Sequence, residues 1–255
     1  MKKNMYYVAI GFLSWTLSNQ VNAGELGFDY ERTPYVISLS GGPAWEQAGQ
    51  TQTFFVQPNI QSTYQAIYNT TTLGVLELFF GYQFNLNELF ISPYYLELGV
   101  AIGGAGNAVL NGNIWEDADP NFNNFTYSAK INQARLLFKS KLFAPIDELN
   151  ELSPYISAGV GAGFNHSYDF TITPKIFQEV PPPAFSTHTT TALMYTLGVG
   201  AQKTIATHWQ FGMGYEFASW GKSGFSSASG QTIGTGLQLN HLYSQEVQFF
   251  ISYVC

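Results

Sequence analysis

The chain ends with Glu246-Val247-Gln248-Phe249-Phe250-Ile251-Ser252-Tyr253-Val254-Cys255, and this stretch decides the fold. Every second side chain is large and apolar, which is the pattern of one face of a β-strand: Val247, Phe249, Ile251 and Tyr253. If the strands form a membrane barrel, the last must pair with the first so that no sheet edge meets lipid. The stretch therefore predicts a closing strand with its apolar face in lipid and Glu246 in the lumen.

Charged residues are scarce in this 255-residue chain. They make up 11% of it, with 10 Lys and Arg against 17 Asp and Glu, about half the share of an ordinary soluble domain. Past the N-terminus, no run of about 18 apolar residues could form a membrane helix. The acidic balance argues against nucleic acid as a partner. The single cysteine, Cys255, excludes an internal disulfide.

The N-terminus has the pattern of a secretory signal peptide. Lys2 and Lys3 precede an apolar segment at about 5–17, and Val21-Asn22-Ala23 supplies small residues for a cleavage site. We predict a signal peptide at 1–23 and a barrel domain at 24–255. An uncleaved membrane anchor is the alternative, but the apolar segment is short for a span.

Seven earlier segments show the same alternation as the closing strand. They begin at Tyr35 and then cover about 71–84, 91–103, 125–143, 154–167, 188–203 and 208–220. The connections alternate long and short, and the long ones fall at about 46–70, 104–124, 168–187 and 221–243. Transmembrane barrels with both chain ends on one side show this order. The sequence predicts an all-β fold, an eight-stranded antiparallel up-and-down transmembrane β-barrel with four long loops on one side.

The two faces of these strands differ in a way that indicates which face meets lipid. A soluble barrel would place charged residues outside, whereas here the less apolar face consists of Gly, Ala, Ser, Gln and a few charges. We therefore expect that face to line the lumen, where its charges form a network: Glu77, Glu97, Arg135, Lys139, Glu216 and Glu246. Because eight strands leave room only for side chains, a plug of ion pairs is expected, with a gated conduction path as the alternative.

Large aromatic residues lie near the predicted strand ends. Two interfacial girdles are a feature of transmembrane barrels. We expect the girdles to contain Trp45, Tyr82, Phe84, Tyr94, Tyr155, Phe164, Trp209 and Trp220.

Signal peptide, strand number, loop order and closing strand together resemble the small outer-membrane barrels of Gram-negative bacteria. This family includes the OmpA transmembrane domain, OmpX and the opacity-type surface antigens. The resemblance implies a location in the outer membrane, contact with its lipid and lipopolysaccharide, and insertion by the barrel-assembly machinery. Members usually end in Phe or Trp, and Cys255 stands at that position here.

Some barrels of this size resemble enzymes that modify lipid A, so catalytic sets were considered. His241, Ser244 and Glu246 lie close in sequence, but His and Ser three apart point to opposite faces of a strand. The sequence predicts no catalytic residue, cofactor or metal site. Aromatic and small polar residues in the long loops suit a host protein or glycan partner. We expect a non-enzymatic surface antigen with an adhesin-like or membrane-integrity role; the alternatives are a lipid-A-modifying enzyme and a narrow pore.

Overall fold

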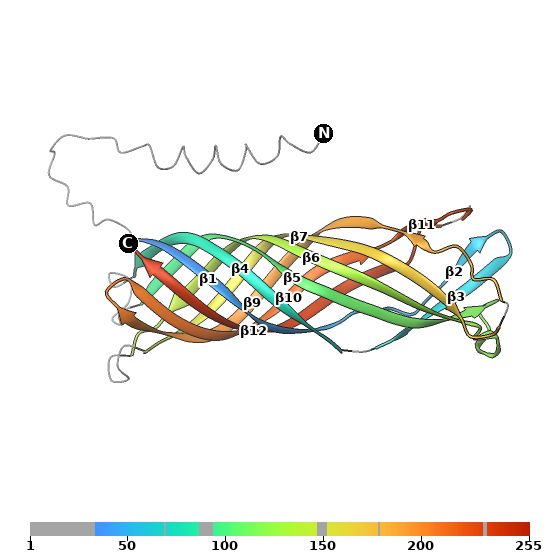
Figure 1. Cartoon of the computed structure of the whole chain (residues 1–255). Helices are drawn as coiled ribbons and strands as arrows, with labels where there is room; N and C mark the ends of the chain where they lie inside the picture. The colour runs from blue at the N-terminus through green and yellow to red at the C-terminus, as the bar shows by residue number, and fades with distance from the viewer. Residues whose placement is uncertain (1–33, 69, 87–93, 147–151, 178, 232–233) are drawn as a thin grey trace, which may run out of the picture. The chain divides into compact units, whose positions relative to one another are not determined.

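A computed structural model describes residues 34–255 except 69, 87–93, 147–151, 178 and 232–233, so the expected signal peptide lies outside the described residues. In the described part, eight antiparallel strands form a closed ring (Figure 1). No helix among these residues is long and apolar enough to cross a membrane. In chain order the ring strands are β1 (Tyr35–Gln47), β4 (Thr70–Asn85), β5 (Tyr95–Glu116), β6 (Phe125–Phe143), β7 (Leu152–Pro174), β9 (His188–Ala206), β10 (Trp209–Gly224) and β12 (Gln238–Val254).

The last strand closes the ring as predicted. β12 pairs with β1 along most of its length, with Leu39 opposite Ile251 and Gln47 opposite Tyr243. Its other edge pairs with β10. Each of the eight ring strands therefore has a paired strand on both sides, which closes the ring.

Several strands run farther than the sequence predicted. The expected loop at 104–124 is strand as far as Glu116, and only the short 3-10 helix η1 (Pro120–Phe122) and its flanks separate β5 from β6. In this extension Asn107 lies outside, while Ala108 and Leu110 are buried inside. Beyond a register shift between Ala105 and Ala108 the alternation resumes with its polarity reversed, so the pattern of lipid-facing apolar residues ends there although the strand does not.

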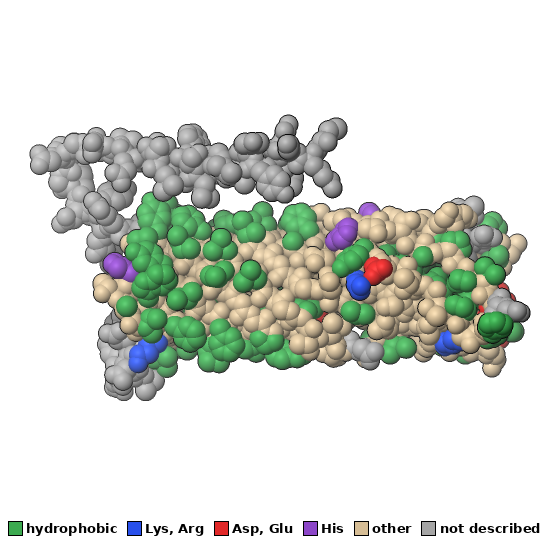
Figure 2. Space-filling model, in the orientation of Figure 1, with side chains coloured by type: hydrophobic (Ala, Val, Ile, Leu, Met, Phe, Trp, Pro, Cys, Tyr) green, Lys and Arg blue, Asp and Glu red, His purple; other side chains and the backbone are tan. Residues whose placement is uncertain are grey.

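β6 shows the reversal within one strand. Towards its end, Leu136 and Phe138 face outward while Arg135 and Lys139 are buried inside. Towards its start, the side chains that are buried inside are apolar: Tyr127, Ala129 and Ile131. We call the end of the barrel with the apolar exterior the apolar-walled half and the other end the tip half. Figure 2 shows hydrophobic side chains gathered over one half of the visible face.

A hairpin in the first connection completes the wall of the tip half. The sequence predicted a loop at 46–70, but this stretch contains β2 (Gln52–Gln57) and β3 (Ile60–Ile67). β4 pairs with the first part of β5, as far as Ala105, and β3 pairs with its last part, from Asn111. In the tip half, the hairpin therefore occupies the place in the wall that β1 and β4 occupy in the apolar-walled half. Two further short strands, β8 (Phe185–Ser186) and β11 (Ser226–Ala228), pair with each other there.

Candidate functional site

The structure buries all six charged side chains that the sequence assigned to the lumen. They come from five strands: Glu77 on β4, Glu97 on β5, Arg135 and Lys139 on β6, Glu216 on β10 and Glu246 on β12. Their inward direction follows from strand parity, because each shares a face with small residues and lies between lipid-facing neighbours. Five of the six lie in direct ionic contact with one another, and Glu97 lies apart from them.

Arg135 holds three carboxylates together. Its Nη2 lies 2.6 Å from Glu77 Oε2 and 3.4 Å from Glu216 Oε1. Its Nη1 donates to both carboxylate oxygens of Glu246, at 3.1 and 3.2 Å. A planar guanidinium can serve several carboxylates in this way because its donors are fixed in a fork. This arginine therefore lies at the centre of the buried network.

Lys139 supplies the second cation of the network. Its Nζ lies 2.6 Å from Glu77 Oε1 and 2.6 Å from Glu216 Oε2. Gln248 adds a neutral donor, with Nε2 at 2.7 Å from Glu246 Oε2. Buried charges are tolerated when they are paired and hydrogen-bonded, and each of these five side chains has an ion pair and at least one hydrogen bond. The arrangement places two cations and three carboxylates in contact inside the lumen.

Glu97 lies opposite a buried cation that the sequence-based network omitted, although its carboxylate oxygens have no hydrogen-bond partner among the described residues. Lys141 lies directly opposite it in the β5–β6 ladder and is also buried. The Lys141 ammonium lies over three aromatic rings, 4.6 Å from the centre of Phe250, 5.2 Å from Phe79 and 5.8 Å from Tyr155. Desolvated cation–π contacts of this kind stabilise an ammonium. The parity of Lys141 with Lys139 was the signal that could have identified it.

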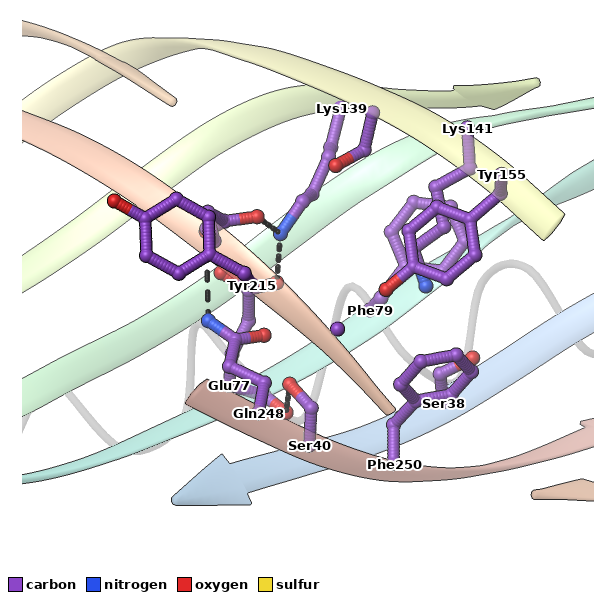
Figure 3. A pocket seen from close by; sticks show the side chains of 13 residues that line it. Ser38, Ser40, Glu77, Phe79, Lys139, Lys141, Tyr155, Tyr215, Gln248 and Phe250 are labelled. Carbon is purple, nitrogen blue, oxygen red and sulfur yellow. Dashed lines mark hydrogen bonds and ion pairs between the residues drawn. The ribbon is translucent and has the colours of Figure 1, made fainter. Parts of the chain in front are cut away.

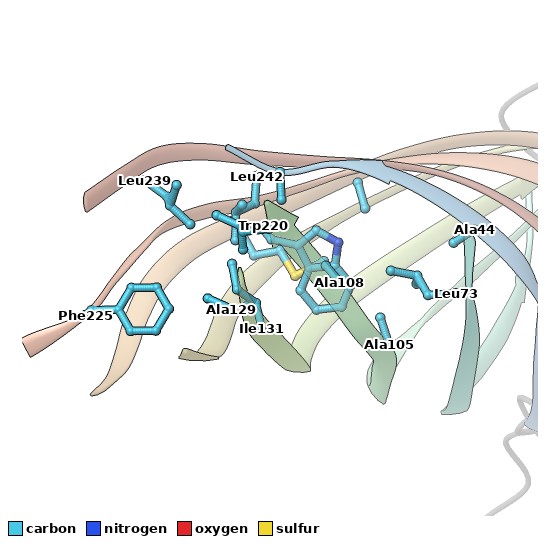
Figure 4. Close-up of a cluster of buried hydrophobic side chains, with 14 of the residues drawn as sticks. Ala44, Leu73, Ala105, Ala108, Ala129, Ile131, Trp220, Phe225, Leu239 and Leu242 are labelled. Carbon is cyan, nitrogen blue, oxygen red and sulfur yellow. The ribbon is translucent and has the colours of Figure 1, made fainter. Parts of the chain in front are cut away.

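Trp220 does not belong to an aromatic girdle. It is fully buried inside the barrel, on the same face of β10 as Glu216, and the Arg135 guanidinium lies 5.4 Å from its ring. Its indole N–H donates to Ser244 Oγ at 2.9 Å, and Ser244 in turn donates to Glu246 at 2.9 Å. The buried N–H thus has a partner, as buried tryptophans require. This contact links the charged network to the apolar interior of the tip half (Figure 4).

Tyr155 also turns inward instead of joining a girdle. Its ring packs against Phe250 at 5.7 Å and over Lys141 (Figure 3). The cause is parity, since the neighbouring Ile156 faces outward. Tyr94 is half-buried, and the other expected girdle residues have outward, exposed side chains: Trp45, Tyr82, Phe84, Phe164 and Trp209.

One more acidic residue lies inside that the sequence had not assigned to the lumen. Glu46 is buried, and Gln133 Nε2 donates to its Oε1 at 3.2 Å. Glu46 had been placed at the start of a polar loop, whereas β1 continues through it to Gln47. Glu46 is an even number of positions from the inward Ser38 and Ser40, and this spacing was the signal that it faces the lumen.

Side chains fill the lumen at the charged network and in the tip half. At the charged network a cavity of about 10 Å³ lies among Ser40, Lys139 and Gln248 (Figure 3), which is room for about one water. On the tip side the interior is apolar and holds Leu110, Ile131, Leu242 and a cluster of aromatic rings. The centre of each ring lies within about 6 Å of the centre of at least one other, in stacked, tilted and edge-to-face contacts: Phe54, Tyr64, Tyr127, Phe170, Phe185 and Phe225.

The structure places the three residues that were weighed as a catalytic set on two sides of the wall. His241 is exposed and stacks on Tyr243 outside the barrel, while Ser244 and Glu246 are buried inside. Among the described residues, no group of three His, Cys, Asp or Glu side chains could hold a metal ion.

The exterior and interior of the apolar-walled half are the reverse of those of a soluble protein. Its outer face exposes large apolar side chains on every ring strand, whereas its ion pairs are inside. A closed antiparallel ring with this polarity satisfies its backbone groups internally and meets hydrocarbon outside. The chain has the fold of the small outer-membrane β-barrels.

Comparisons with known proteins were made at the levels of sequence and structure. Neither a protein-family model nor a curated protein sequence matches this chain. Similar solved structures include OprG from Pseudomonas aeruginosa, at 12% identity and a TM-score of 0.47, covering 87% of this chain and 96% of that one. The outer-membrane protease OmpT from Escherichia coli has 9% identity and a TM-score of 0.45, covering 91% and 99%. Neisserial surface protein A has 11% identity and a TM-score of 0.41, covering 86% and 96%.

Proposed function

We propose that this outer-membrane barrel is a non-enzymatic surface antigen that holds an adhesin-like tip above the membrane. The observation that carries the proposal is the reversal of polarity along β5, β6 and β7. Beyond the apolar wall the same strands continue with a polar exterior and a packed apolar interior. The part that projects is therefore a stiff continuation of the barrel, and its end presents a defined surface to a partner.

A cleft at the end of the tip half supports a macromolecular partner. It has a volume of about 180 Å³ and lies between β3, the segment before β8 and the segment after β11. Its lining combines apolar rings with small polar groups: Ile60, Ser62, Tyr64, Pro182, Pro183, Phe185 and Gln231. Rigid rings beside adaptable hydrogen-bonding groups are a common combination in protein-binding surfaces. We expect a host protein or glycan here.

Three further elements of the proposal concern the route to the membrane. The segment 1–23 would direct export and be removed after Ala23. The barrel-assembly machinery would bind the closing strand through Val247, Phe249, Ile251 and Tyr253. Outer-membrane lipid and lipopolysaccharide would then surround the apolar wall.

Adherence of cells with altered tips tests the adhesin role. Deletion of the gene is expected to lower adherence to host cells. Ile60→Glu with Ser229→Glu, which introduces charge into the cleft, should have the same effect. The matched control is Phe122→Glu, at an exposed position on η1 of the same tip. Normal adherence of the deletion strain would reject the adhesin role, and detergent sensitivity of that strain would assign a membrane-integrity role in its place.

The enzyme alternative has a separate test. Because His241 and Ser244 lie on opposite sides of the wall, deletion should leave the acyl chain pattern of lipid A unchanged. Mass spectrometry of lipid A from the deletion and parent strains measures this pattern. A change that the intact gene reverses would contradict the non-enzymatic proposal.

A further inference from the structure

The wall of the barrel contains a window where its hydrogen-bond ladder changes partner. β5 pairs with β4 up to Ala105 and with β3 from Asn111. Between these points, within the described wall, residues 106–110 of β5 have no backbone pairing to β4. The Thr71 hydroxyl bridges part of the window: it accepts from the Val109 N–H at 3.5 Å and donates to the Val109 carbonyl at 3.4 Å.

Glycines make the outer side of this window hollow. Gly74, Gly104 and Gly106 occupy outward positions beside it and line an open groove of about 620 Å³. A Cβ at Gly74 would meet no atom within 4 Å, and one at Gly106 would come no closer than 3.6 Å. At Gly74 and Gly106 the groove is therefore space left by absent side chains, and larger residues fit there. At Gly104 a Cβ would come within 2.9 Å of the Gln133 carbonyl oxygen, so that position has no such room.

The surroundings of the groove define the chemistry of its occupant. On the side of the apolar-walled half, the rim consists of lipid-facing side chains, with Leu76 61% and Ile102 60% exposed. On the side of the tip half, Asn132 Nδ2 donates to Asn107 Oδ1 at 3.2 Å on the exposed outer surface. The groove is thus continuous with the apolar wall at one end and with a pair of amides at the other. A bilayer lipid has the same sequence of groups, hydrocarbon followed by an ester or amide.

We propose that the window is a docking slot for one acyl chain of a bilayer lipid. The chain lies in the groove over Gly74 and Gly106, with its ester or amide group beside Asn107 and Asn132. Burying a hydrocarbon chain there increases its packing contacts, and it covers a part of the wall where backbone groups are not all paired. The proposal depends on the membrane fold and is independent of the adhesin role.

Photolabelling in vesicles tests the slot. The full mature chain is folded into phosphatidylcholine vesicles that contain phosphatidylcholine with a diazirine on its acyl chain, and labelled residues are mapped by mass spectrometry. We expect several-fold more label on 70–76 and 103–107 than on Leu193, Tyr195 and Leu197, whose side chains are exposed on another part of the wall. The double variant Gly74→Leu and Gly106→Leu should lose the excess, and Ala162→Leu, at an outward position on β7 away from the groove, should keep it.

Other outcomes would overturn the proposal. Uniform labelling of the wall in the unsubstituted protein would reject a slot, and so would an excess that persists in the double leucine variant. Excess labelling by a diazirine free fatty acid but not by the phospholipid would reject a bilayer lipid as the occupant. Heat-modifiable gel migration shows whether each variant is folded. If the leucine pair fails to fold, Gly74→Ala and Gly106→Ala must each lower the excess.

Discussion

The side-chain amide of Gln52 bonds both backbone groups of Gln238. Its Nε2 donates to the Gln238 carbonyl, and its Oε1 accepts from the Gln238 N–H at 3.1 Å. Gln50 Oε1 similarly accepts from the Asn240 N–H at 3.1 Å. Side chains of the segment at β2 thus continue the seam of β12 beyond the point where its pairing with β1 ends. In the tip half, the ring is closed by glutamine amides instead of a strand.

Truncating this amide should loosen the seam of the tip. Two hydrogen bonds of ordinary net strength predict that Gln52→Ala makes local opening easier by about 1–3 kcal/mol. Hydrogen exchange of the Gln238 and Asn240 amides measures this opening, which should become faster, while exchange at Glu246 should not change. Gln61→Ala is a matched truncation on the same hairpin. Unchanged exchange at Gln238 would contradict the role of Gln52.

Removal of Arg135 should destabilise the barrel strongly. Arg135→Leu leaves Glu246 and its neighbours buried with Lys139 as the remaining cation of the network, and breaking a buried pair costs about 3–5 kcal/mol. Urea unfolding in vesicles measures the loss. The control is Lys130→Leu on the same strand, which breaks the Lys130–Asp169 pair at the surface and should have little effect because solvent screens that pair. Equal losses in the two variants would contradict the plug.

The same network should not act as a gate. Because Trp220 and the apolar tip interior remain in place, Arg135→Ala should leave planar bilayers without single-channel currents. The unsubstituted protein, recorded at the same protein-to-lipid ratio, is the reference. Discrete currents in the variant alone would favour a gated conduction path.

Trp220 should behave as a core residue in two independent measurements. Trp220→Ala should lower the free energy of unfolding by about 3–5 kcal/mol, since it removes a large buried ring. Single-tryptophan variants should show that brominated acyl chains quench Trp209, which is 44% exposed on the wall, but not Trp220. Equal quenching of the two would place Trp220 in a girdle after all.

The tip should lose stability in alkali. Burial raises the pKa of Tyr64 and of Tyr127 above the ordinary value of 10.0, and both lie in the tip half, outside the membrane. The unfolded chain therefore releases these protons at lower pH than the folded chain does, so stability is complete below pH 10 and falls as pH rises above it. Tyr64→Phe with Tyr127→Phe should weaken this dependence in urea titrations between about pH 9 and pH 11. Control substitutions of the exposed Tyr68 should leave the pH dependence of stability unchanged.

The periodicity of the sequence was sufficient to predict the ring and its closure. Alternation by two assigns each side chain to a face, so the inward direction of Glu77 or Arg135 could be inferred from neighbours such as Leu76 and Leu136. Which charges meet could not be inferred, because it depends on the stagger of strands around the ring. Arg135 meets Glu246 across the lumen although 111 positions separate them.

The tip half was missed because the same alternation carries opposite chemistry there. Asn107, Asn111 and Asn113 have the composition of a loop, but they are the outer face of a strand whose inner face is Ala108, Leu110 and Ile114. Trp220 and Tyr155 were assigned to girdles from their place near strand ends, although parity put both inside. For these two residues, the alternation of faces along the strand agrees with the structure, whereas a place near a strand end does not indicate a girdle.

The buried cations of β6 also distinguish correct from incorrect strand alignment during assembly. A slip of β6 by one residue would turn Arg135, Lys139 and Lys141 towards lipid and Leu136 and Phe138 into the lumen. Each exposed cation would then cost about 2–4 kcal/mol near the middle of the bilayer. An apolar strand with a Gly-rich reverse face would slip at far lower cost. The inward cations of β6 therefore make a misaligned barrel less stable than the correctly aligned one.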